Sequence, residues 1–439
     1  MNNTLKSKVV KLTAAIAAGA TLLSVAACGA QPGGASGKAT GANATVWSLT
    51  DSTWDSVKQT FEDWNKDHAD AQIKADYFAN DAYKEKIRTA IGSGNAPTLV
   101  LSWGGSPVTD YANNDNIVDL TSDLEATVKE KVLDSVAAEG YRDGKLVAVP
   151  VGQVQPAVLW TNKAVLKEAG ISDVPATWDE LLDDVAKLKE AGKTPIALAG
   201  GSKWPYLMWA AYLIDRIGGP EVMQNILDGK ADAWIDPAVI EAMTKIQELV
   251  DAGAFGDSYS SMSADDKKDT ALLANGQAGF DLMGSWVYAD FGTINADFAK
   301  NDLGWATFPA IEGGKGDATM LTGNLANYWS VASSASKESQ QTAISYLKEN
   351  TYSDGIVDGL LEMGGVPPVK GIEDKVKASD DTGFLTWVYD AVSNASNYQL
   401  SLDVALPSDQ GQALLNNLEQ VFLKQITPEQ FADAMNQTL

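Results

Sequence analysis

Cysteine and histidine are almost missing from this sequence, which has one of each in 439 residues. A single cysteine, Cys28, cannot form a disulfide within the chain, so a large hydrophobic core must stabilise the folded part. A single histidine, His68, leaves Ser-His-Asp and Cys-His nucleophiles little to build on and excludes metal sites that need several histidines. We therefore predict no metal site, and we interpret His68 as an exposed residue at the end of a helix.

Positive charge is also scarce. Lysine and arginine number 33 against 58 aspartates and glutamates, which gives a formal net charge of -25. Such a chain is a poor partner for nucleic acid and for anionic surfaces. The acidic residues are scattered rather than clustered, so we interpret most of them as a solvated, soluble surface. A neutral ligand suits this charge better than a polyanion.

Nucleotide-binding motifs are missing as well. The sequence has no Gly-x-x-x-x-Gly-Lys-Ser/Thr loop and no Gly-x-Gly-x-x-Gly after a strand, and the glycines of 313–316 are typical of a turn. We therefore predict no cofactor. A glycoside hydrolase needs only two carboxylates, which this acidic chain could supply, although no pair has a distinguishing local context. A secreted hydrolase of that kind is the remote alternative to a binding protein.

The N-terminus carries a long uncharged run. Residues 12–27 follow a short segment with three lysines, as in a secretory signal peptide, and the run is too short for a comfortable membrane span. Residues 25–28, Val-Ala-Ala-Cys, match the lipobox of bacterial lipoproteins. We predict a lipoprotein signal peptide over 1–27 and a lipid anchor (diacylglyceryl, palmitate) on Cys28. The Gly-rich and Ala-rich residues 28–43 predict a flexible tether, which would hold the folded part at the extracellular face of the cell membrane.

Strand and helix patterns alternate after the tether. The pattern predicts strands over 45–49, 73–78 and 98–103, with helices over 54–64 and 81–91 between them. This order implies a parallel sheet. A second block starts with a capping box at 177–180 and a buried strand at 195–199, and further helices begin at Asp236 and Thr427.

Two such blocks predict an α/β chain with more than one domain. Ligands in open α/β sheets bind beyond the carboxyl ends of strands or between domains. Here that rule points to the loops that follow Leu49, Phe78 and Leu101.

Tryptophan is abundant, with 13 residues, and several of them stand beside glycine, proline or asparagine rather than in amphipathic patterns. A sugar ring has an apolar face and a belt of hydroxyl groups, so its site needs flat aromatic platforms with polar side chains at their edges. The loop candidates for such platforms are Trp103, Trp204, Trp286, Trp329 and Tyr328. We expect Trp54, Trp64, Trp178, Trp209 and Trp234 to be core or capping residues.

The order and spacing of several segments resemble one family, the extracellular solute-binding proteins of oligosaccharide ABC importers, which includes the maltose-binding proteins. The matching segments are 81–90, 94–99, 149–150, 159–163, 175–181, 276–280, 283–286 and 365–368. The resemblance implies a periplasmic-binding-protein-like α/β fold, with two α/β lobes, a ligand cleft between them and two or three crossover segments. It places lobe 1 at 44–154 plus 327–365 and lobe 2 at 155–326 plus 366–439. It also implies a monomer without enzymatic activity that delivers its ligand to the permease subunits of an ABC importer.

Within that family, segments 102–105, 203–209, 323–324 and 399–403 resemble the branch that binds xylo-oligosaccharides, including arabinosylated ones. Leu402 stands where that branch carries a tryptophan. Raffinose-type, fructo- and malto-oligosaccharides remain alternative ligands. A cell-wall adhesin is a third possible class of protein, beside the receptor and the hydrolase. The resemblance implies that the loop aromatic residues are stacking platforms, and that the partners of the sugar hydroxyls are Asp51, Asn80, Gln155, Lys203, Asn324, Asn327 and Asp403.

Overall fold

The computed structural model describes residues 41–379 and 382–439, which belong to one compact unit. The predicted signal peptide, Cys28 and the tether up to residue 40 lie outside the described residues. Within those ranges no helix has the length and apolar character that a membrane span requires. The same ranges hold no group of three or more His, Cys, Asp or Glu side chains suited to a metal ion.

The first lobe is built on a five-stranded sheet in the order β2-β1-β3-β12-β6. β1 (Ala44–Leu49) pairs in parallel with β2 (Ile73–Phe78) and β3 (Leu99–Ser102), as the strand and helix pattern predicts. β12 (Asn327–Val331) lies antiparallel between β3 and β6 (Val149–Val151). Every residue of β1 and of β12 is buried, as expected for strands covered on both faces.

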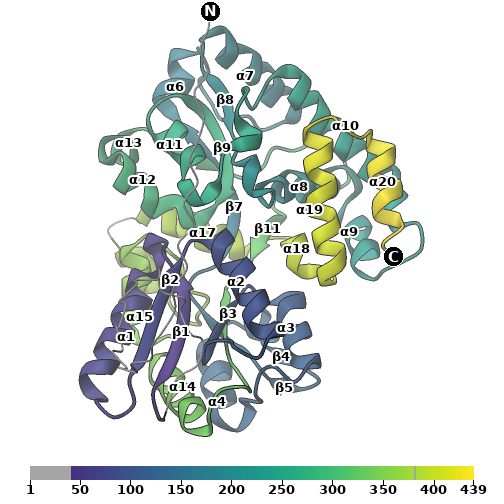
Figure 1. The fold of residues 1–439 in the computed structure, drawn as a ribbon. Coiled ribbons are helices and arrows are strands. Elements are labelled where there is room, and N and C mark those ends of the chain that lie inside the picture. The colour runs from purple at the N-terminus through teal and green to yellow at the C-terminus, as the bar shows by residue number, and fades with distance from the viewer. Residues whose placement is uncertain (1–40, 380–381) are drawn as a thin grey trace, which may run out of the picture. The chain divides into compact units, whose positions relative to one another are not determined.

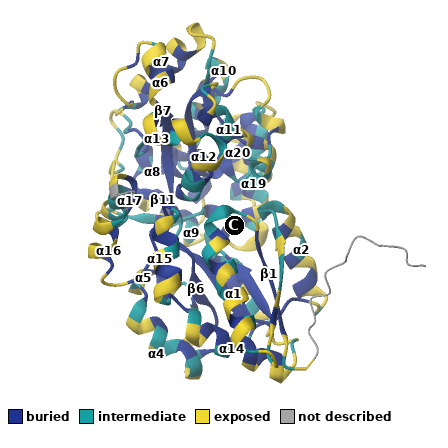
Figure 2. Ribbon diagram, turned by 90° about the vertical axis from the view of Figure 1, so that its left-hand side faces the viewer, coloured by how far each residue is buried: buried dark blue, intermediate teal, exposed yellow. Residues whose placement is uncertain are grey.

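Helices surround this sheet, and their buried faces turn toward it while their exposed faces turn outward (Figures 1 and 2). They are α1 (Asp55–Asp67), α2 (Asn80–Gly92), α3 (Gly105–Asn113), α4 (Thr121–Lys131), α5 (Asp134–Ala138), α14 (Lys337–Asn350) and α15 (Asp354–Glu362). A two-stranded hairpin, β4 (Tyr141–Arg142) with β5 (Lys145–Leu146), follows α5.

The second lobe is built on a six-stranded sheet in the order β13-β11-β7-β9-β8, with β10 paired to β7. α8 (Pro205–Gly218) is its central helix, because residues 205–217 are all buried. The strands are β7 (Gln155–Asn162), β8 (Thr194–Ala197), β9 (Ala278–Gly284), β10 (Leu303–Ala306), β11 (Leu321–Asn324) and β13 (Tyr398–Leu400). The other helices are α6 (Lys163–Glu168), α7 (Trp178–Glu190), α9 (Pro220–Leu227), α10 (Pro237–Ala252), α11 (Lys268–Ala274), α12 (Tyr288–Ile294), α13 (Ala296–Asn301), α17 (Thr382–Ser393), α18 (Leu402–Ala405), α19 (Ser408–Phe422) and α20 (Pro428–Asn436).

The chain crosses between the sheets where β6 passes to β7 and where β11 passes to β12. The sequence predicts a further crossing at residue 365, and backbone contacts with the first lobe continue beyond that point. Val369 forms a bridge with Val132, and the amide of Lys370 donates to the carbonyl oxygen of Lys131 at 2.8 Å. These backbone bonds hold the segment against α4, so we propose that the first lobe continues through α16 (Glu373–Ala378).

Helix ends follow their local sequence signals. Thr177 and Thr427 each form a complete capping box, with Glu180 and Gln430 respectively, and Asp236 accepts from the amide of Ala238. These side-chain acceptors satisfy amide groups that the first turn of a helix leaves unpaired. His68 ends α1 but is only partly exposed, because its ring stacks on Trp64 at a centroid distance of 3.5 Å.

Candidate functional site

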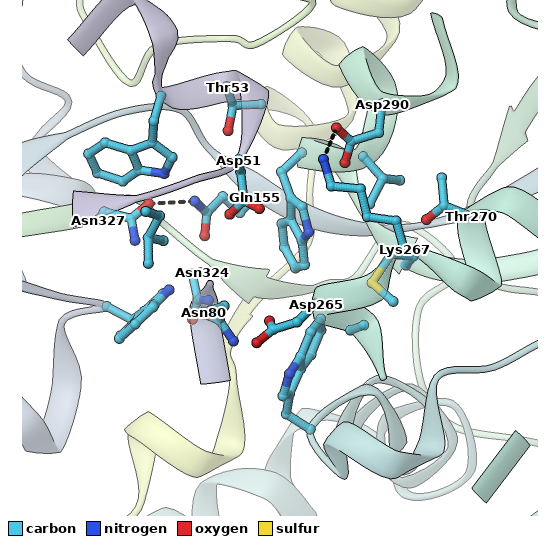
Figure 3. A pocket seen from close by; sticks show the side chains of 18 of the residues that line it. Asp51, Thr53, Asn80, Gln155, Asp265, Lys267, Thr270, Asp290, Asn324 and Asn327 are labelled. Carbon is cyan, nitrogen blue, oxygen red and sulfur yellow. Dashed lines mark hydrogen bonds and ion pairs between the residues drawn. The ribbon is translucent and has the colours of Figure 1, made fainter. Parts of the chain in front are cut away.

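A cavity is lined by residues of both lobes (Figure 3). Asp51, Asn80 and Trp103 line it from the first lobe, each just beyond the end of β1, β2 or β3, and Asn80 is the first residue of α2. Gln155 and Asn324 line it from the ends of β7 and β11, where the chain crosses between the sheets. The parallel strands of the first sheet therefore deliver their carboxyl ends to one side of the cavity.

Indole rings form flat parts of the lining. Trp103, Trp204 and Trp286 are all partly exposed, and the rings of Trp204 and Trp286 lie 5.9 Å apart with an angle of 51° between their planes. The ring of Trp286 folds over Gly284, where a Cβ atom would come within 1.8 Å of it. A glycine at 284 is therefore required for this position of the ring.

Amide groups line the cavity at the crossings between lobes. The side-chain nitrogen Nε2 of Gln155 donates to Asn327 Oδ1 at 2.6 Å, a contact drawn in Figure 3. Asn324 Oδ1 and Asn327 Nδ2 are buried and have no hydrogen-bond partner among the described residues. Buried polar atoms are normally paired, so these two atoms are suited to bond a ligand hydroxyl.

Direct hydrogen bonds join the two lobes at the rim of this cavity. The carboxylate of Asp81, in the first turn of α2, accepts from Ser202 Oγ at 2.5 Å and from Trp204 Nε1 at 3.1 Å. In return, Asp265 of the second lobe accepts from the backbone amide of Asp81 at 3.1 Å. The N-cap residue of α2 is Ala79, which has no side-chain acceptor. The second lobe thus supplies the missing helix cap, and these contacts define a closed arrangement of the lobes.

Residues 47–349 match the family model of the bacterial extracellular solute-binding proteins. The chain belongs to that family. This solute-binding protein is 28% identical over 376 residues to the diacetylchitobiose binding protein DasA of Streptomyces coelicolor, across 82% of each chain. It is 28% identical over 215 residues to a probable sugar-binding periplasmic protein of Rhizobium meliloti, which is about half of each chain, 47% and 48%.

A solved structure from work on xylan utilization by the thermophilic bacterium Caldanaerobius polysaccharolyticus is similar to this solute-binding protein throughout. The TM-score is 0.81 at 28% sequence identity, and the match covers 90% of this chain and 100% of that one. The fold class predicted from the sequence, a periplasmic-binding-protein-like α/β fold, is confirmed.

Two of the predicted platforms lie in the core of this solute-binding protein instead of in the cavity. Tyr328 is fully buried and its hydroxyl donates to the carbonyl oxygen of Val136 at 2.9 Å. Trp329 is 2% exposed and packs edge-on against Trp54 at a centroid distance of 5.8 Å. Both predictions were wrong because β12 lies between two other strands and is covered on both faces, so that of this strand only its first residue, Asn327, reaches the cavity.

Lys203 and Asp403 also lie outside the main cavity. Lys203 Nζ forms an ion pair with Glu419 at 2.7 Å and donates to Asn416 at 3.1 Å, both on α19. Lys203 lines a groove beside the main cavity instead. Asp403 lines a smaller cavity beside the main one and forms an ion pair with Lys84 at 3.7 Å.

Several residues of the lining were not predicted from the sequence. Trp54, expected in the core, is 4% exposed and still lines the cavity. Lys84, Asp265, Lys267 and Asp290 line it as well, and Lys267 forms an ion pair with Asp290 at 2.6 Å. No local signal separates these charged residues from a solvated helix face, because their position depends on how the lobes meet.

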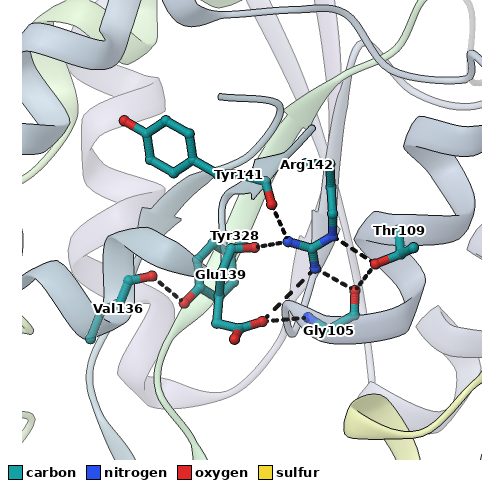
Figure 4. Close-up of polar contacts among 7 residues, drawn as sticks. All are labelled: Gly105, Thr109, Val136, Glu139, Tyr141, Arg142 and Tyr328. Carbon is teal, nitrogen blue, oxygen red and sulfur yellow. Dashed lines mark hydrogen bonds and ion pairs between the residues drawn. The ribbon is translucent and has the colours of Figure 1, made fainter. Parts of the chain in front are cut away.

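A hydrogen-bond network supports the loop that carries Trp103 (Figure 4). The guanidinium of Arg142 donates to the carbonyl oxygen of Gly105 at 2.7 Å and to Thr109 Oγ1 at 2.6 Å. The carboxylate of Glu139 accepts from the amide of Gly105 at 3.2 Å. Charge-assisted bonds of this kind hold a loop firmly, so the turn after Trp103 is fixed from the first lobe alone.

The carboxyl group of Asp51 makes stability depend on pH. Burial, followed by the negative charge of Asp290, raises the pKa of Asp51 to about 6. A pKa above the unfolded value means that the folded protein binds the proton more tightly, so this group's stabilising contribution is full below the unfolded pKa and is lost as pH rises through about 6. We expect the unfolding temperature to be higher at about pH 5 than at about pH 7, and the difference to be smaller in Asp51→Asn. An equal difference in both proteins, measured by calorimetry, would contradict this assignment.

Proposed function

We propose that this protein captures oligosaccharides outside the cell and delivers them intact to the permease of an ABC importer. The observation that carries the proposal is the lining of the cavity. Three partly exposed indoles line it together with two buried amide atoms, on Asn324 and Asn327, that have no hydrogen-bond partner among the described residues. Indole faces suit the C–H faces of sugar rings, and free amide groups suit their hydroxyls. Membership of the solute-binding family supports the role in transport.

The ligand class that we propose is xylo-oligosaccharides, including arabinosylated ones. The support is the similarity to the structure from work on xylan utilization, at 28% identity over nearly the whole folded part. A chitin-derived oligosaccharide is the second candidate, because DasA, a diacetylchitobiose binding protein, is also 28% identical to this chain.

The lipid anchor on Cys28 belongs to the same proposal and places the receptor on the outer face of the membrane. Mass spectrometry of the mature N-terminal peptide tests it.

Thermal unfolding in the presence of different sugars tests the ligand class. A ligand at one hundred times its dissociation constant adds about 2.7 kcal/mol to the free energy of unfolding. The mature protein would be heated with xylotriose, xylotetraose, an arabinosyl-xylotriose, diacetylchitobiose, maltotriose and raffinose in turn. If xylo-oligosaccharides raise the unfolding temperature most, the result supports the proposal. The largest increase with diacetylchitobiose would overturn the pentose assignment, and no increase with any sugar would overturn the receptor.

We further propose that sugar binding closes the two lobes, and that the bond from Ser202 to Asp81 stabilises the closed form. Ser202→Ala should weaken sugar binding by about 1 to 2 kcal/mol, because it removes a hydrogen bond to a charged group that joins the lobes. Ser172→Ala is the matched control, since Ser172 Oγ donates to Asp173 at 2.7 Å within one lobe. Titration should show no loss of affinity in the control. Equal affinities of the two variants would contradict a role in closure.

A further inference from the structure

Three cavities meet at one lysine of the closed structure. Lys84, on α2, lines the main cavity, a smaller cavity and an outer groove. Trp103 and Trp204 line all three as well. The side chain of Lys84 therefore lies where the three hollows adjoin one another.

The ammonium group of Lys84 stands against both indoles. Lys84 Nζ lies 4.8 Å from the ring centroid of Trp103 and 6.0 Å from that of Trp204. A cation within about 6 Å of an indole centroid is attracted by the negative face of the ring. These are also the faces on which a sugar ring would stack, so the lysine and a sugar ring compete for the same surface.

An ion pair between the lobes holds the lysine in this place. Lys84 Nζ lies 3.7 Å from a carboxylate oxygen of Asp403, whose side chain is 13% exposed. Lys84 belongs to the first lobe and Asp403 to α18 of the second. The pair therefore joins the two lobes beside the cavity.

The groove beyond this pair has the chemistry of a site for more sugar units. It is lined by the hydroxyl-bearing or amide-bearing side chains of Tyr111, Asn114, Ser408 and Gln412, together with Asp110. Trp103 and Trp204 line the main cavity and this groove alike, so a chain that extends from one to the other runs along these rings and meets the ammonium group.

We propose that Lys84, held by Asp403, is a gate that sets the length of the oligosaccharide this protein accepts. This inference rests on the proposed function of the same site. In the wild-type protein the gate makes chains that fill the main cavity bind best, and longer chains gain nothing from the outer groove. Without the lysine side chain, a longer chain continues along the indoles into the groove and gains contacts there.

The test is a series of titrations with xylo-oligosaccharides of two to six units. Lys84→Ala should raise the affinity for the longest chains relative to the shortest by at least tenfold compared with the wild type. Lys86→Ala is the matched control. Lys86 lies on the same helix and its Nζ is 4.8 Å from the ring of Trp47, but it lines none of the three cavities. The control should keep the wild-type length profile.

The other outcomes separate a failure of the gate from a failure of the proposed receptor function. An unchanged length profile in Lys84→Ala would overturn the gate and leave the receptor intact. A uniform loss of affinity at every length would also overturn it, because Lys84 would then act on binding or closure rather than on length. Absence of binding by the wild-type protein itself would overturn the proposed function. Lys84→Arg, which keeps the charge and the size of the barrier, should retain the wild-type profile.

Discussion

Replacing Gly105 with alanine should weaken sugar binding at least tenfold. Gly105 follows Trp103 by two residues, and a Cβ atom there would lie 2.0 Å from the carbonyl oxygen of Val404 and 2.7 Å from its carbonyl carbon. Val404 belongs to α18 of the second lobe, so the collision is between the lobes and exists only when they are closed. Overpacking a rigid contact costs about 1 to 3 kcal/mol, and here that cost falls on the closed state.

The Gly105→Ala substitution requires a control, because the φ angle of +58° at this position disfavours alanine even without the collision. Gly144, in the hairpin of the same lobe, has φ +73° and open space where its Cβ would be. Gly144→Ala carries the same backbone penalty without the collision. Calorimetric titration should show that Gly144→Ala keeps wild-type affinity while Gly105→Ala loses it. Matching affinities in the two variants would mean that the lobes do not approach each other at Gly105 in the bound state.

Replacing Trp286 with alanine should weaken sugar binding by about 1.5 to 4 kcal/mol, on the scale of a central aromatic residue at an interface. The variant loses a stacking surface and also the neighbour of the Trp204 ring. Trp387→Ala is the matched control, because Trp387 is partly exposed on α17 and stacks on Phe384 without lining the cavity. An unchanged dissociation constant in Trp286→Ala would remove this residue from the site.

The sequence predicts the parts of the site that local rules control. The carboxyl ends of the parallel strands β1, β2 and β3 point to one edge of a sheet, and that edge brings Asp51, Asn80 and Trp103 to the cavity. The starts of α7 and α20 are also predicted, because each is marked by a capping box whose two residues are only three positions apart.

Residues whose role depends on distant pairing are not predicted. Trp329 follows a Gly-Asn segment that resembles a loop, yet β12 pairs with β3, more than two hundred residues earlier, and becomes a buried central strand. Lys84 and Asp265 look like ordinary charged residues of a solvated surface. Their contacts, with Asp403 and with the backbone amide of Asp81 respectively, join the two lobes. No local sequence pattern predicts contacts between segments that lie so far apart in the chain.

Calorimetric titration of the mature protein with xylotetraose, followed by chromatography of the recovered sugar, separates a receptor from an enzyme. We expect saturable binding of one sugar per protein, with micromolar or tighter affinity, and recovery of the tetrasaccharide intact. Shortened products would contradict the receptor role and point to a hydrolase. The absence of binding heat for xylotetraose and for every other soluble oligosaccharide, with retention on insoluble polymer, would contradict it in favour of an adhesin.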